Sequence, residues 1–165
     1  MSSVVRPARE EDLPALNDLY NHYIVHTPIT FDIQPWSLEQ RREWFSHYGE
    51  TGPHRLLVAV RDGGVAGYAS SGRFRPKAAY ATSVEASVYL APGHEGRGLG
   101  TALYRVLFEV LAAEPVHRVL AGITLPNPAS LALHARFGFL PIGVFDEVGH
   151  KLGRYWSVQW LEKRL

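Results

Sequence analysis

The clearest pattern in the chain lies between residues 83 and 111, where a period of two gives way to a period of three to four. Along residues 83–90, apolar and polar side chains alternate, as in a strand with one buried face. Along residues 99–111, apolar side chains recur every three or four positions, which predicts an amphipathic helix. Gly96, Gly98 and Gly100 alternate between the two patterns. The segment therefore predicts a strand, a glycine-rich turn and the start of a helix.

Similar runs on both sides of this unit predict the other elements. Helices are expected at residues 10–26, 37–48, 99–114 and 127–137. Strands are expected at residues 3–6, 55–60, 65–74, 79–90, 118–124, 139–147 and 154–160. This order is typical of a mixed α/β fold, and no repeat or linker divides it. We therefore expect one domain over residues 1–165.

The composition narrows the class of protein. The chain has 165 residues, and its 17 basic and 16 acidic side chains give a net charge of +1. This balance gives no electrostatic reason to expect a nucleic acid or an anionic membrane as a partner. The first residues lack the apolar core of a signal peptide, and no apolar run could span a bilayer, so a cytoplasmic protein is expected. Because cysteine is absent, neither a disulfide framework nor a cysteine nucleophile is possible.

The glycine-rich turn suits a phosphate group. The first N–H groups of a helix have no partner within the helix, and the helix dipole is positive at that end. Glycine lets the main chain approach an anion closely, and Arg97 adds a positive charge. The spacing differs from the G-x-G-x-x-G of dinucleotide-binding folds, and no Lys-Ser or Lys-Thr pair closes the loop as in a nucleoside triphosphate site. From spacing alone, an ordinary strand-to-helix turn stays an alternative.

Two segments narrow the kind of phosphate ligand. Glu95-x-x-Gly98-x-Gly100 resembles the pyrophosphate-binding motif Q/R-x-x-G-x-G/A of the GNAT superfamily, with Glu at the usual Gln or Arg position. Residues 127–139 resemble that superfamily's N-x-x-S/A-x-x-x-Y-x-x-x-G-F element, with His134 where many members have Tyr. The resemblance implies an N-acetyltransferase that uses acetyl-coenzyme A (acetyl-CoA) as cosubstrate. It also implies that the Glu95 side chain points away from the phosphates.

A wider set of residues, spread over nearly the whole chain, narrows the resemblance to one branch of the superfamily. The set comprises Asn21, Tyr23, Thr27, Thr30, Phe31, Tyr80, Val84, Glu85, Ser87, Val88, Tyr89, residues 132–134 and residues 147–151. These residues recur in phosphinothricin acetyltransferase and its relatives that acetylate methionine sulfoximine and methionine sulfone. The resemblance implies a mixed, mostly antiparallel sheet of about seven strands with four helices, whose central strands splay apart to admit the pantetheine arm. It also implies a small amino-acid-like amine as acceptor, and a homodimer.

The resemblance further implies which residues contact the cofactor. The expected residues are Val88, Tyr89, Leu90, Glu95, Gly96, Arg97, Gly98, Leu99, Gly100, Thr101, Asn127, Ser130 and His134. Residues 96–101 would hold the pyrophosphate, and a main-chain N–H near Val88 would polarise the thioester carbonyl. Asn127 and Ser130 equally suit plain helix caps, and residues 88–90 could simply pair within the sheet.

Glu85 and His134 are the expected catalytic residues. Glu85 lies on the polar face of its strand, and alternation alone would make it an ordinary surface carboxylate. The resemblance implies instead that it removes a proton from the substrate amine, as a general base acting through water. His134 is expected near the coenzyme A thiolate, either as a general acid or as a structural hydrogen-bonding residue. Without a cysteine nucleophile, acetyl transfer would be direct.

A further group of residues is expected to contact the acceptor, since it borders the substrate cleft of the resembled family. The group is Phe31, Arg73, Arg75, Lys77, Tyr80 and Glu85. Arg75 would bind the carboxylate of an amino acid, whereas Arg73 and Lys77 could also be solvated charges at a strand end. Phe31 and Tyr80 would cover a short apolar side chain, or else pack in the core.

Two alternatives to an amino acid acetyltransferase stay open. The same fold could acetylate a protein N-terminus, a polyamine or an aminoglycoside, although sites for the last two are rich in acids and these segments are basic. A non-catalytic acyl-CoA-binding module would lack the base, whereas Glu85 is present. His22 and His26 are spaced as metal ligands on a helix can be, but no third ligand converges with them, so no metal is expected.

Overall fold

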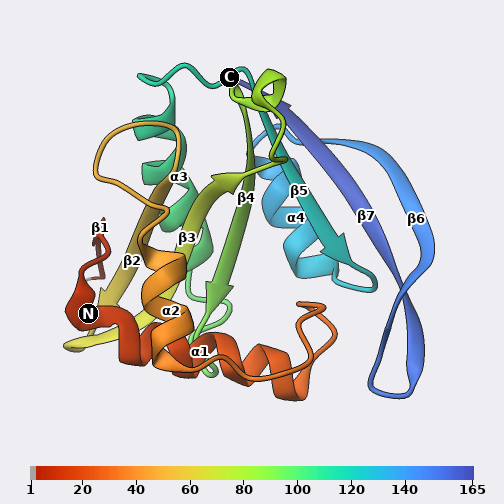
Figure 1. The fold of residues 1–165 in the computed structure, drawn as a ribbon, viewed down its shortest axis with the longest axis horizontal. Helices are drawn as coiled ribbons and strands as arrows, with labels where there is room; N and C mark the ends of the chain where they lie inside the picture. Colours follow the sequence, from red (N-terminus) through yellow and green to blue (C-terminus); the bar gives the residue numbers. More distant parts are fainter. Residues whose placement is uncertain (1–2) are drawn as a thin grey trace.

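The computed structural model of the chain describes residues 3–165 and contains one mixed sheet with helices on both faces (Figure 1). The strands are β1 (Val4–Pro7), β2 (Arg55–Arg61), β3 (Gly64–Arg73), β4 (Ser83–Leu90), β5 (Arg118–Thr124), β6 (Leu140–Lys151) and β7 (Arg154–Arg164). The helices are α1 (Leu13–His26), α2 (Leu38–Phe45), α3 (Leu99–Leu111) and α4 (Pro128–Arg136). The strand order is β1-β2-β3-β4-β5-β7-β6. This arrangement confirms the fold expected from the sequence.

The two faces of the sheet bury separate hydrophobic clusters. Val84 and Ala86 of β4 pack with α3 on one face. Leu56 and Val58 of β2 and Tyr68 of β3 pack with α1 on the other. Because both faces of the inner strands are covered, β2 has a continuous apolar run in place of an alternating one.

The centre of the sheet is splayed between β4 and β5. These two strands run parallel and pair over only three positions, from Ser83 opposite Arg118 to Glu85 opposite Leu120. Beyond Glu85, β4 continues to pair with β3, and β5 continues to pair with β7. The two strands therefore diverge toward their carboxyl ends, as Figure 1 shows.

The boundaries differ from the expectation mainly in β4, β6 and β7, and β7 continues to Arg164, beyond its expected end at residue 160. β4 starts at Ser83 and not at position 79, because Ala78–Tyr80 form a 3₁₀ turn. β6 continues to Lys151, beyond its expected end. A register shift between Phe145 and Gly149 interrupts the alternation there, and such an irregularity hides a strand from a search for a period of two.

Candidate active site

Glu85 lies where β4 and β5 separate. It is the last residue of β4 that pairs with β5, and its neighbour on β3 is Gly72, which places no side chain beside the carboxylate. Burial raises the pKa of the Glu85 carboxyl, and the positive charge of Arg75 opposes that rise. A carboxylate with a raised pKa is a stronger proton acceptor, so Glu85 has the properties of a general base.

The side chain of Glu85 borders a pocket of about 720 Å³, called here the Glu85 pocket. Its lining residues are His47, Tyr48, Pro53, His54, Ser70, Gly72, Arg73, Arg75, Lys77, Ala78, Tyr80, Ala81, Ser83, Glu85 and Ser87. They come from the segment after α2, from β3 and β4, and from the connection between these two strands. The structure thus brings together Arg73, Arg75, Lys77, Tyr80 and Glu85 of the expected acceptor residues.

Positive charge dominates the Glu85 pocket. Arg73, Arg75 and Lys77 line it, while Glu85 is the one acidic side chain among its described lining residues. Burial lowers the pKa of His54, and the positive charge of Arg73 lowers it further. The pocket therefore suits a molecule that carries a negative charge in addition to its amine.

The glycine-rich turn presents main-chain N–H groups at the start of α3. The N-cap residue is Gly98, whose φ of 77° is left-handed, and Gly96 has a φ of 69°. Glycine adopts such angles without strain from a Cβ atom. Because Gly98 has no side chain that could cap the helix, the first-turn amides are left to an external acceptor. The turn is therefore suited to an anion.

Three charged side chains lie around this turn. Arg136 of α4 borders the turn and donates to the Thr101 hydroxyl oxygen at 2.9 Å. Arg97, expected to add charge here, is exposed and lies outside the cleft lining. The Glu95 carboxylate accepts a hydrogen bond from the amide of Gly93 at 2.8 Å, within its own loop. Arg136 therefore lines the cleft beside the helix start, and the expected contact of Arg97 with the cofactor stays a prediction.

Shared residues connect the turn with the Glu85 pocket. The glycine-turn cleft has a volume of about 460 Å³. It is lined by Tyr23, Ile29, Val88, Tyr89, Leu90, Glu95, Gly96, Gly98, Leu99, Gly100, Thr101, Asn127, Ala129, Ser130, Leu133 and Arg136. A narrower space of about 50 Å³, the β4–β5 gap, shares Val88, Asn127 and Ser130 with this cleft and Ser87 with the Glu85 pocket. The β4–β5 gap therefore borders both of the larger hollows.

His134 is buried beside the β4–β5 gap. Its Nδ1 lies 2.7 Å from the carbonyl oxygen of Ser130, which can only accept, so Nδ1 carries the proton. Nε2 then accepts from the Tyr104 hydroxyl, 2.9 Å away. Burial lowers the pKa of His134, although the bond to Ser130 opposes this effect. The ring is therefore neutral at neutral pH, with both nitrogens engaged, and its role as an acid stays a prediction.

The main chain of residues 88–90, expected to meet the pantetheine arm, is partly engaged already. The Leu90 carbonyl oxygen accepts from the Tyr23 hydroxyl at 2.7 Å. The Tyr89 ring stacks on Tyr68, with 5.3 Å between centroids, so its side chain packs toward α1. Val88 and Tyr89 border both the glycine-turn cleft and the β4–β5 gap, whereas Leu90 borders the cleft and not the gap.

Two other expected site residues have structural contacts. Phe31 lies outside the lining of the Glu85 pocket, and its ring rests on the main chain of Gly149. Asn127 caps α4, because its Oδ1 accepts from the Ser130 amide at 3.1 Å. Asn127 and Ser130 nevertheless also border the cleft and the gap, so a capping role does not remove them from the site.

The histidine pair of α1 forms no metal site with its surroundings. The rings of His22 and His26 have centroids 5.0 Å apart. Among residues 3–165, no group of three or more His, Asp or Glu side chains is placed to hold a metal ion.

Sequence reasoning missed several lining residues. Ser87 shares the face of Glu85 on β4, and Ser70 lies opposite Ser87 on β3, so alternation could have found both. Tyr104 sits in the apolar stripe of α3, where nothing separates it from a core residue. Tyr48 follows α2 and reaches the pocket through the tertiary fold alone.

Comparison with known proteins agrees with this geometry. The model of the Acetyltransferase (GNAT) family matches residues 16–139. The chain belongs to the GNAT acetyltransferase family. As a GNAT acetyltransferase it is an enzyme, and the splayed β4 and β5 and the glycine-rich turn are the parts of the fold where its chemistry is expected.

The similar proteins narrow this GNAT acetyltransferase to the phosphinothricin type. It is 56% identical to the phosphinothricin N-acetyltransferase of Streptomyces coelicolor, over 98% of this chain and 95% of the relative. It is 34% identical to an L-methionine sulfoximine/L-methionine sulfone acetyltransferase of Pseudomonas paraeruginosa, over 100% and 96% of the two chains. A solved phosphinothricin acetyltransferase from Sinorhizobium meliloti, in complex with AcCoA, gives a TM-score of 0.94 at 30% identity, covering 100% of this chain and 89% of that one.

Proposed function

We propose that this GNAT acetyltransferase transfers the acetyl group of acetyl-CoA directly to the amino group of a small amino acid analogue that carries a carboxylate. Phosphinothricin, methionine sulfoximine and methionine sulfone are the leading candidates, because they are named in the activities of the similar proteins. One observation carries the proposal. The β4–β5 gap joins the glycine-turn cleft to the Glu85 pocket at Ser87, which is next to Glu85 on the same face of β4.

The glycine-turn cleft fits the cosubstrate. The uncapped amides at the start of α3 and the guanidinium of Arg136 would hold its pyrophosphate. The Val88 main chain, at the junction of the cleft and the gap, would bind the arm that leads toward Glu85. When bound, the cosubstrate supplies an acetyl thioester, an electrophile that the protein itself lacks.

The Glu85 pocket supplies the remaining chemistry. Arg75, with Arg73 and Lys77 around it, would bind the carboxylate of the acceptor and so orient its amine. Glu85 would then take a proton from the ammonium group through water, which leaves the nitrogen lone pair free to attack the acetyl carbon. As the C–N bond forms, the thioester C–S bond would break, and coenzyme A would leave as a thiolate that takes up the second proton lost by the nitrogen. The raised pKa of Glu85 makes it a stronger base than a solvated glutamate.

The substitution Glu85→Gln tests the base. It keeps the size of the side chain and removes its basicity, so we expect kcat/KM to fall about 100-fold or more at pH 7.5. The affinity for coenzyme A, measured by calorimetry, should be unchanged, because the glycine-turn cleft excludes Glu85. Glu39→Gln, on the exposed side of α2, is the matched control. Activity near that of the wild type in Glu85→Gln would remove Glu85 from this role.

The pH dependence gives a second test of the same residue. A general base must be deprotonated, so kcat/KM should rise with pH through the pKa of Glu85 and then level off. Because burial raises this pKa, the rise should lie at a higher pH than for an ordinary glutamate. The profile in Glu85→Gln should lose this rise.

A panel of amines assayed by thiol release tests the acceptor class. Phosphinothricin, methionine sulfoximine and methionine sulfone should react faster than a polyamine, an aminoglycoside or a peptide N-terminus, because the pocket is basic. A faster reaction with a polyamine, an aminoglycoside or a peptide N-terminus would contradict the proposal that the acceptor is an amino acid analogue. Coenzyme A binding without transfer to any amine would instead support the non-catalytic module.

Association and location are further parts of the proposal. We expect a homodimer, which is supported by the exposed apolar side chains Leu140, Ile142 and Val144 of β6 and by Tyr155 of β7. Sedimentation equilibrium measures the mass in solution, and a monomer at micromolar concentration would contradict it. No helix within residues 3–165 has both the length and the apolar character needed to cross a membrane. The cytoplasmic location expected from the sequence stays a prediction.

A further inference from the structure

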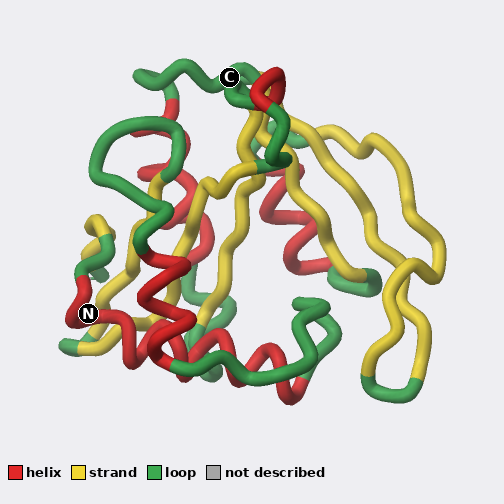
Figure 2. Tube along the Cα trace, viewed as in Figure 1, coloured by secondary structure: helices red, strands yellow, loops and turns green. Residues whose placement is uncertain are grey.

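Residues 27–37, the α1–α2 loop, are held by hydrogen bonds from α1. The Tyr20 hydroxyl lies 2.8 Å from Thr30 Oγ1. Further along, Asn21 accepts from the Trp36 amide at 2.8 Å and donates to the Trp36 carbonyl at 2.9 Å. Figure 2 shows this segment as an irregular connection that passes from the end of α1 toward the β6–β7 hairpin before it returns to α2. The Tyr20 hydroxyl also donates to Asp32, so α1 holds the loop at Thr30, Asp32 and Trp36.

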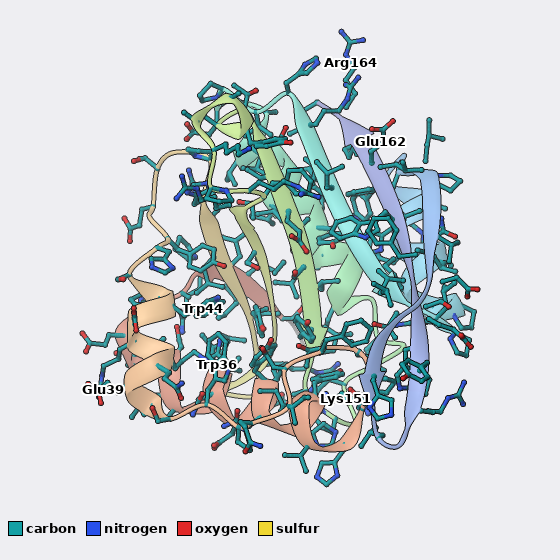
Figure 3. All side chains as sticks on the ribbon, turned by 45° about the vertical axis from the view of Figure 1, so that its right-hand side comes forward. Trp36, Glu39, Trp44, Lys151, Glu162 and Arg164 are labelled. Carbon is teal, nitrogen blue, oxygen red and sulfur yellow. The ribbon has the colours of Figure 1, made fainter. Side chains whose placement is uncertain are left out.

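A buried lysine from the far end of the chain holds the middle of the loop. Lys151, at the end of β6, donates through Nζ to the carbonyl oxygen of Thr30 at 2.7 Å. In Figure 3, the labelled Lys151 points from the hairpin toward this loop. Only 6% of Lys151 is exposed, and burial lowers the pKa of its ammonium group, an effect that Asp32 opposes. Lysine is seldom buried, because burial of its charge costs free energy. The position of Lys151 therefore indicates a structural role in holding the loop.

Gly149, on the same strand, leaves room for the ring of Phe31, the next residue of the loop. A Cβ atom at Gly149 would lie 2.3 Å from Phe31 Cε2, so the ring occupies the space that any larger residue would fill. The hairpin therefore contacts consecutive residues of the loop in two ways, through the Lys151 hydrogen bond to Thr30 and through the Phe31 ring. Both contacts come from residues 147–151, a segment that the family resemblance singled out and that no step of the reaction uses.

The neighbour of these two loop residues lies at the proposed cofactor site. Ile29 borders both the glycine-turn cleft and the β4–β5 gap. Because Thr30 and Phe31 are anchored to the hairpin, Ile29 is held at the wall of the cleft. Ile29 is itself 38% exposed, so it forms the solvent-facing rim of the cleft, and this rim would be lost if the loop moved away.

We propose that Gly149 and Lys151 are positioning residues that hold the α1–α2 loop so that Ile29 closes the wall of the coenzyme A site. This inference rests on one part of the proposed function, namely that the glycine-turn cleft binds coenzyme A. The β6–β7 hairpin then acts on the cosubstrate through the loop, without any contact of its own with the glycine-rich turn.

Two substitutions test this role independently. Lys151→Met keeps the length of the side chain and removes the hydrogen bond, and Gly149→Ala displaces the Phe31 ring. We expect each to weaken coenzyme A binding about fivefold to tenfold by calorimetry, the size of effect typical of one buried hydrogen bond. Hydrogen exchange of residues 28–33 should become faster in both variants, and the acceptor KM should change less than coenzyme A affinity.

Two matched controls separate positioning from general destabilisation. Lys163→Met on β7 removes a similar bond, in which Nζ donates to the Phe137 carbonyl oxygen at 2.7 Å. Gly143→Ala on β6 adds a methyl group where no described atom lies within 4 Å. Both controls should keep coenzyme A affinity and the slow exchange of residues 28–33.

The outcomes that overturn this inference differ from those that overturn the proposed reaction. Unchanged coenzyme A affinity in both test variants overturns the inference, and so does an equal loss in the controls. Absence of acetyl transfer to every amine in the panel, with coenzyme A still bound, counts against the proposed function alone. If one test variant fails to fold, the other still decides, because the two perturb different contacts.

Discussion

The Glu85 pocket and the glycine-turn cleft both border the β4–β5 gap, yet they present different kinds of polar group. The pocket presents side chains, and the cleft presents main-chain amides. The polar groups of the Glu85 pocket are side chains, chiefly Arg73, Arg75, Lys77 and Glu85. The cleft offers main-chain amides at the uncapped start of α3, with Arg136 as the cation beside them. Changes of side chain should therefore alter the pocket directly, whereas the cleft should respond most to changes of main-chain conformation.

This contrast has a chemical reason. A pyrophosphate is the same in every acetyl-CoA molecule, and a row of N–H groups binds it whatever side chains surround it. An acceptor is recognised by its particular arrangement of amine and anion, which needs side chains of defined length and charge. The cleft thus tolerates an unusual residue such as Glu95, whose carboxylate is bonded within its own loop.

The substitution Arg75→Met tests the role of side chains in the Glu85 pocket. Loss of a charge-assisted, bidentate contact with the acceptor carboxylate should weaken binding by about 2 kcal/mol, or roughly 30-fold in acceptor KM. Steady-state kinetics with the best acceptor of the panel measures this effect, and the KM for acetyl-CoA should not change. Arg42→Met, an exposed arginine of α2, is the control. An equal rise in both KM values would show that the two hollows are not independent.

The substitution Gly98→Ala tests the role of the main chain in the glycine-turn cleft. A Cβ atom at a φ of 77° should cost about 1–2 kcal/mol and change the turn, so coenzyme A affinity should fall about tenfold. Gly63→Ala introduces the same strain in the β2–β3 turn, at a φ of 81°, away from the site. Calorimetry should find lower affinity only in Gly98→Ala, while thermal unfolding shows destabilisation in both. Wild-type affinity in Gly98→Ala would refute a main-chain phosphate site.

A smaller effect distinguishes the two arginines near the glycine-rich turn. Arg136→Gln should weaken coenzyme A binding about threefold to fivefold, as expected for one partly solvated ionic contact. Arg97→Gln should have less effect, because Arg97 lies outside the cleft lining. Titrations at low and at high salt should converge for the wild type and Arg136→Gln, since salt screens this contact. The reverse order of the two arginines would restore the role that the sequence suggested for Arg97.

The smallest expected effect concerns the gap between the two hollows. Tyr104→Phe removes the donor to His134 Nε2 and keeps the aromatic ring, so stability should fall by about 1 kcal/mol. The nitrogen resonances of the His134 ring should report an Nε2 without its donor and an Nδ1 that remains protonated. Coenzyme A affinity and acceptor KM should both stay within about twofold of the wild type, well below the effect of a lost hydrogen bond to a ligand. A larger change in coenzyme A affinity would show that the β4–β5 gap contributes to cosubstrate binding. A larger change in acceptor KM would show that it contributes to acceptor binding.

The local patterns of the sequence predicted most of the fold because each depends on near neighbours. The alternation of residues 83–90, the period of α3 and the glycine-rich turn are all set by side-chain direction and by backbone freedom within a few residues. The end of β6 was missed because its register shift destroys the period on which the prediction depends. The 3₁₀ turn before β4 was missed because nothing in its sequence separates it from a strand.

The site divides in the same way. By itself the sequence determined that a carboxylate at position 85 precedes a glycine-rich turn at a helix start, because both lie on one continuous strand–turn–helix unit. The tertiary structure alone decided that Arg136 joins that turn, that Tyr104 bonds His134, and that Lys151 holds Thr30. Each of these contacts joins segments far apart in the chain, and such a pairing depends on how the elements pack and not on any local pattern.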